Sequence, residues 1–142
     1  MEASENFDDP VTKQAWLDRQ KENVKGYLSE ERIKFTNEPE VNWFLAPYIS
    51  VWHIKPDLWI ISGDLPTDYI HDKSILSVTE AVKYFATRWL EISTYLLKGK
   101  QHPQLPIGKT QKAEELKEMG SLLQSRAKLF LKWIDEKIIG KE

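Results

Sequence analysis

The spacing of apolar residues along the chain predicts three helices. After an Asp-Pro helix start, apolar positions recur at helical spacing and predict a helix over about residues 10–32. A capping box that begins at Ser77 opens a second helix over 78–98, whose apolar residues form one continuous face. Thr110 can cap a third amphipathic helix, which is expected to end near Gly140.

Between the first two helices, the pattern changes to that of strands. Residues 43–54 are β-branched and aromatic with a period of two, and 58–62 form a second apolar run after the turn residues 55–57. Pro47 cannot donate a hydrogen bond to a neighbouring strand, so either its end of the strand is an edge or the strand starts after it. These runs predict an antiparallel hairpin. Because two strands alone are only marginally stable, we expect the hairpin to lie on the helices, to gain a strand from 67–76, or to pair across a dimer.

The order of these elements predicts a small α+β fold. It reads helix, strand, strand, helix, helix, with the antiparallel hairpin packed on three helices. With 142 residues, the chain has the length of one domain. We therefore expect a flexible N-terminus over residues 1–9 and a single domain over 10–140.

The amino-acid composition excludes several kinds of functional site. The chain has no cysteine, which excludes disulfides, thiolate zinc sites and cysteine nucleophiles. Its 20 Lys and Arg nearly balance 22 Asp and Glu, unlike a general nucleic-acid binder, so no nucleic-acid partner is expected. The sequence contains no apolar run of membrane-spanning length, and its acidic start is unlike a secretory signal. We expect a cytoplasmic protein without a membrane partner.

Charge is distributed unevenly along the chain. The first 76 residues carry 14 acidic and 8 basic side chains, whereas the remainder carries 8 acidic and 12 basic ones. This asymmetry suits an ordinary solvated surface with internal complementarity, or a cationic partner for the first half. The six tryptophans add large side chains of the kind that fill both cores and interfaces.

The densest set of reactive side chains lies in residues 63–72, Gly-Asp-Leu-Pro-Thr-Asp-Tyr-Ile-His-Asp. We expect a loop between a buried strand and a capped helix, a place where binding residues often lie. A purely structural role is the alternative, because Asp, Gly and Pro are the usual turn residues. The candidate binding residues in and around this segment are Asp64, Thr67, Asp68, Tyr69, His71, Trp52, His53, Arg88 and Arg126.

For several of these candidate residues, a purely structural role is an alternative to binding. Arg88 and Arg126 lie on predicted helices, where each can reach water or form a bidentate pair with a carboxylate of segment 63–72. His53 is expected to be a partly buried sheet residue, and His102, which precedes a proline, is expected to face water.

Three stretches of the sequence resemble one known family. They are Ala46-Pro47-Tyr48-Ile49-Ser50-Val51-Trp52, the run from Trp59 to Tyr69 that contains Gly-Asp-Leu-Pro-Thr-Asp-Tyr, and Arg88-Trp89. Ser125-Arg126-Ala127 in the last predicted helix also resembles the C-terminal part of this family. Over about residues 42–134 the chain resembles the bacterial family known as domain of unknown function 4826. The chain departs from it at residues 55–57, where the family has a longer, glycine-containing loop. The resemblance implies no particular activity.

These observations favour a non-catalytic module that binds a protein partner or a small ligand. Segment 63–72 and the aromatic edge of the hairpin are the expected binding surface. An immunity or antitoxin-like role is one version, in which an acidic surface neutralises a basic toxin. A homo-oligomeric scaffold, such as a homodimer paired through its sheet, is an alternative.

The other alternative is a small hydrolase or metal-dependent enzyme. It would use Asp64, Asp68 and His71, since two nearby carboxylates can divide acid and base roles. Against this, the sequence contains no HExxH, Gly-x-Ser-x-Gly or phosphate-loop motif, and its histidines lack metal-ligand spacing. No metal site and no cofactor are therefore predicted.

Overall fold

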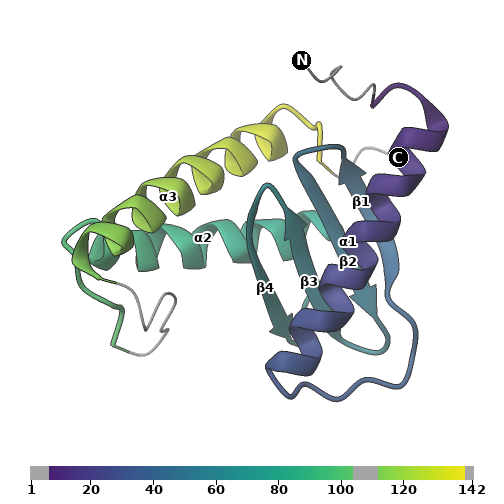
Figure 1. Ribbon diagram of the computed structural model, residues 1–142, viewed down its shortest axis with the longest axis horizontal. Coiled ribbons are helices and arrows are strands. Elements are labelled where there is room, and N and C mark those ends of the chain that lie inside the picture. Colours follow the sequence, from purple (N-terminus) through teal and green to yellow (C-terminus); the bar gives the residue numbers. More distant parts are fainter. Residues whose placement is uncertain (1–6, 104–111, 140–142) are drawn as a thin grey trace. The chain divides into compact units, whose positions relative to one another are not determined.

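The computed structural model describes residues 7–103 and 112–139. The chain divides into two compact units, Met1–Leu76 and Ser77–Glu142, which are described separately. The helices and strands follow in the predicted order of helix, strands, helix, helix, and the α+β class is confirmed (Figure 1). In the described part of the chain, no helix combines the length and apolar character needed to cross a membrane.

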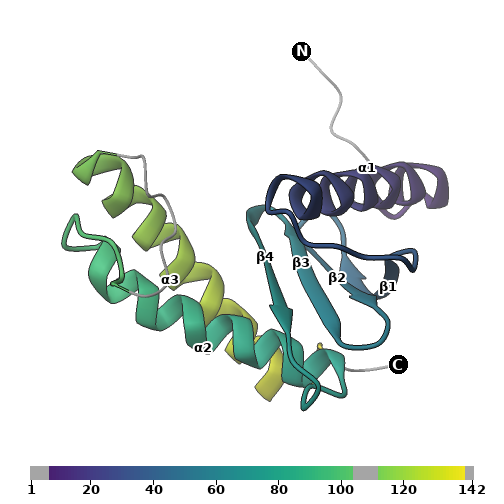
Figure 2. The ribbon, with the colours of Figure 1, turned by 90° about the horizontal axis from the view of Figure 1, so that it is seen from below.

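The first unit consists of one helix and a four-stranded antiparallel sheet. Helix α1 (Pro10–Glu30) begins as predicted, with the Asp9 carboxylate accepting a hydrogen bond from the Thr12 N–H at 3.0 Å. It lies over one face of the sheet (Figure 2). The strands follow one another in space in chain order as β1 (Glu40–Leu45), β2 (Ile49–Ile54), β3 (Leu58–Gly63) and β4 (Leu65–His71).

The sheet corrects two details of the predicted strands. The run 43–54 is two strands, because the chain reverses at Ala46–Pro47 and the Tyr48 N–H donates to the Leu45 carbonyl at 2.8 Å. Strand β2 therefore starts after Pro47, as one of the two alternatives for that proline stated, and the residues before it belong to a separate strand. Most of segment 63–72 is strand β4, where a loop was expected. One of the three alternatives for the hairpin was an added strand from residues 67–76. The sheet does contain such a strand, β4, but it begins at Leu65 and ends at His71.

The core of the first unit lies between α1 and the sheet. Side chains from one face of α1 meet alternate residues of β2 and β3, and the buried set is Trp16, Leu17, Val24, Leu28, Trp52, Ile54, Leu58 and Ile60. Two buried hydrogen bonds among Gln20, Ser50 and Ser62 also lie in this core. The Ser62 hydroxyl donates to the Gln20 amide oxygen at 2.5 Å, and the Ser50 hydroxyl donates to the Ser62 carbonyl at 3.0 Å. Because hydrogen bonds are directional, these bonds fix the position of α1 on the sheet more closely than apolar contact alone would.

The second unit is a pair of antiparallel helices, α2 (Val78–Leu96) and α3 (Ala113–Asp135), which lie side by side in Figures 1 and 2. Ser77 caps α2 as predicted, accepting from the Glu80 N–H at 3.2 Å. The proposed cap at Thr110 lies outside the described residues. The helices approach closely at Gly120, where a Cβ would lie 2.9 Å from both the Leu96 Cβ and the Leu97 nitrogen.

Two glycine-to-alanine substitutions should have opposite effects on stability. Gly120→Ala is expected to cost about 1–3 kcal/mol, because the added methyl group forces α2 and α3 apart. Gly26→Ala is expected to add about 0.5–1 kcal/mol, since Gly26 lies inside α1 and a Cβ there would meet no atom within 4 Å. Urea denaturation of both variants beside the parent measures the difference, and equal shifts would contradict the close helix packing.

Candidate functional site

The residues predicted to form one site are spread along β4 and over both faces of the sheet. Asp64 precedes the strand and His71 ends it, so the strand separates them by roughly 20 Å. Asp68 pairs with Ile61 and its side chain is 4% exposed, whereas His71 pairs with Leu58 on the face that α1 covers. Asp64, Asp68 and His71 therefore do not converge on one position.

One end of the sheet is built by the stretches that carry the family resemblance. Gly63 has φ = 146°, and a Cβ there would overlap the Tyr48 carbonyl and lie 2.9 Å from the Ile49 Cα. The chain then turns into β4, and the Asp64 N–H donates to the Tyr48 carbonyl at 2.9 Å. This bond ties the β3–β4 turn to the β1–β2 turn. Because the Tyr48 side chain is 52% exposed and Asp64 is exposed, the two present a polar and aromatic patch, here named the sheet-end surface.

The aromatic residues expected at an exposed hairpin edge belong to the core. Trp52 is 3% exposed, and its indole N–H donates to the Ser50 hydroxyl at 2.8 Å. Tyr69 is half-buried and faces Tyr27, with ring centroids 6.1 Å apart, and Thr67 is also half-buried on β4. Trp52 and Tyr69 therefore belong to the packing of α1 on the sheet. Among the described residues of this unit, the exposed aromatic side chain is that of Tyr48, which was named only as part of the resemblance.

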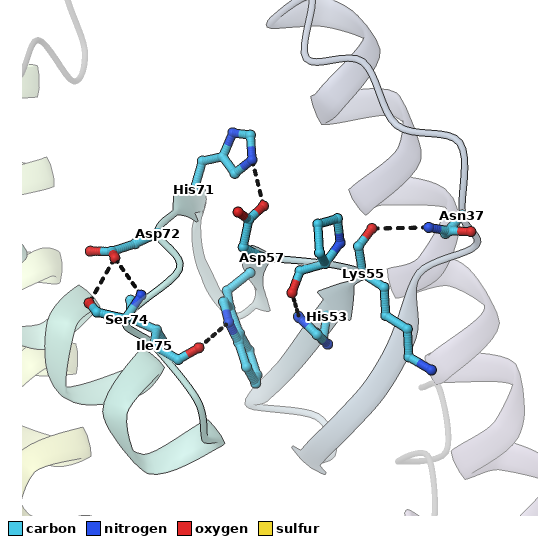
Figure 3. Close-up of polar contacts among 10 residues, drawn as sticks. Asn37, His53, Lys55, Asp57, His71, Asp72, Ser74 and Ile75 are labelled. Carbon is cyan, nitrogen blue, oxygen red and sulfur yellow. Dashed lines mark hydrogen bonds and ion pairs between the residues drawn. The ribbon is translucent and has the colours of Figure 1, made fainter.

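The opposite end of the sheet holds a histidine–carboxylate pair (Figure 3). The His71 Nε2 lies 2.7 Å from the Asp57 Oδ1, and the side chains are 63% and 12% exposed. The buried Oδ1 atom accepts no well-aligned hydrogen bond, so the two side chains make a close polar contact. Sequence reasoning treated Asp57 only as a turn residue, because its partner lies 14 positions further along the chain.

Neighbouring contacts brace this end. His53 is half-buried in β2, as predicted, and its ring stacks on Trp59 at a centroid distance of 4.3 Å. The Trp59 indole N–H donates to the Ile75 carbonyl at 3.3 Å. The Ser74 hydroxyl and N–H both donate to the Asp72 carboxylate, at 2.7 and 2.8 Å, and these bonds lower the pKa of Asp72. The arrangement holds the β4 exit to the β2–β3 turn.

The remaining candidates lie in the second unit. Arg88 is on α2 and Arg126 is on α3, both half-buried, and the predicted bidentate pair with segment 63–72 stays a prediction. The expectation for His102 is wrong, because its side chain is 8% exposed. The chain turns back after α2, so the His102 ring packs edge-on against Tyr95 and its Nε2 lies 3.2 Å from the Glu91 carboxylate.

Metal coordination finds no support in the described ranges 7–103 and 112–139, where no group of three or more His, Asp or Glu residues is placed to hold an ion. Comparison with protein families matches residues 11–139 to a domain of unknown function (DUF4826). No curated protein and no solved structure matches the chain.

The close approach at Gly63 can be tested directly. Gly63→Ala is expected to lose about 1–3 kcal/mol of stability, because alanine is strained at this φ and its methyl group meets the Tyr48 carbonyl. Thermal unfolding measures the loss, and amide hydrogen exchange should show faster exchange of the Asp64 N–H. A variant as stable as the parent, with an equally protected Asp64 amide, would show that the two turns do not depend on glycine.

Proposed function

Because the chain belongs to the DUF4826 family, whose description assigns no activity, we propose a function from its geometry: a non-catalytic module that binds a protein partner through the sheet-end surface of Tyr48 and Asp64. One observation carries the proposal. An exposed tyrosine and an exposed aspartate come from separate turns and are held side by side by the hydrogen bond between the Asp64 N–H and the Tyr48 carbonyl.

The rigidity of this surface supports binding. The backbone of Tyr48 makes two hydrogen bonds, donating to Leu45 and accepting from Asp64, and Gly63 packs against its carbonyl. A tyrosine offers a large amphipathic contact at a low cost in side-chain entropy. Since the backbone is already ordered, less conformational entropy is lost when a partner binds.

Charge indicates the kind of partner. Residues 1–76 carry 14 acidic and 8 basic side chains, so the unit that bears the sheet-end surface is negative. Such a field accelerates association with a positively charged protein and disfavours acidic ones. The partner would present Lys or Arg beside an apolar side chain that packs on Tyr48. A bacterial, cytoplasmic immunity or antitoxin-like protein that neutralises a basic toxin is the specific version of this proposal.

The arrangement gives less support to an enzyme. A hydrolase needs its acid, base and positive charge around one reacting atom. Asp64 and His71 lie at opposite ends of β4, and Asp68 is buried on the other face of the sheet from His71. The arrangement of these residues therefore favours a binding module over a hydrolase.

Site-specific photo-crosslinking tests the proposed surface. A photoreactive phenylalanine analogue is placed at Tyr48 in cells that naturally produce the protein, and at Tyr84 as the control. Tyr84 is a matched control because it is also exposed, at 42%, but lies on α2 in the second unit. We expect one adduct of discrete mass from position 48, with a basic protein, and none from position 84. Equal labelling at both positions, or none at position 48, would contradict the proposal.

The partner identified in this way permits a quantitative test. Tyr48→Ala is expected to weaken its binding at least about tenfold, equivalent to about 1.4 kcal/mol, as for a central interface tyrosine. Added salt should weaken binding further by screening the acidic unit. Titration calorimetry at low and high salt measures both effects, with thermal unfolding as the check that the variant is folded. If the Tyr48→Ala variant bound the partner as tightly as the parent does, the binding site would have to lie elsewhere on the protein.

A further inference from the structure

We draw no further inference here: the strongest candidate, the apolar outer edge of strand β1 from Trp43 to Leu45, carries none, because nothing in the described residues shows what covers it.

Discussion

The sheet depends on one close approach of two backbones. Residue 63 passes the Tyr48 carbonyl at a separation that leaves no room for a Cβ, and it does so at a φ that favours glycine. Only then does the next N–H, that of Asp64, reach the same carbonyl. This contact ends β3, directs the chain into β4 and joins the two turns at one end of the sheet. The exposure of Tyr48 beside Asp64 follows from it, and so does the surface proposed for binding.

The sequence predicted elements well where the signal is local. Asp9 and Ser77 cap their helices as expected, because a cap and its helix lie within four residues. Pairing between strands is not local in this way. Pro47 suggested that a strand could start after it, but the reversal that makes residues 40–45 a separate, paired strand is visible only in the structure, in the bond from the Tyr48 N–H to the Leu45 carbonyl. Residues 65–71 have the composition of a loop, yet they form a strand because β3 offers them a ladder.

The prediction that three residues of segment 63–72 converge failed for the same reason, because contacts between distant residues cannot be found from local sequence. Closeness in sequence suggested that Asp64, Asp68 and His71 act together, but a strand separates its residues by about 3.3 Å each and alternates their faces. The contacts that formed instead join residues far apart in the chain, such as Asp57 with His71 and Gln20 with Ser62. No spacing rule within one sequence could pair them. The two longest stretches that resemble a known family, 46–52 and 59–69, meet at the sheet-end surface, although Tyr48 was not among the candidate binding residues.

The proposed binding surface combines a contact of short range with a field of longer range. The bond from the Asp64 N–H to the Tyr48 carbonyl orders both turns before a partner arrives, so the proposed contact loses little backbone entropy on binding. One exposed tyrosine makes a small contact, and the acidic charge of residues 1–76 adds an attraction that acts at a greater distance. In this proposal, the backbone contact at Gly63 determines where a partner binds, and the charge determines which partners approach.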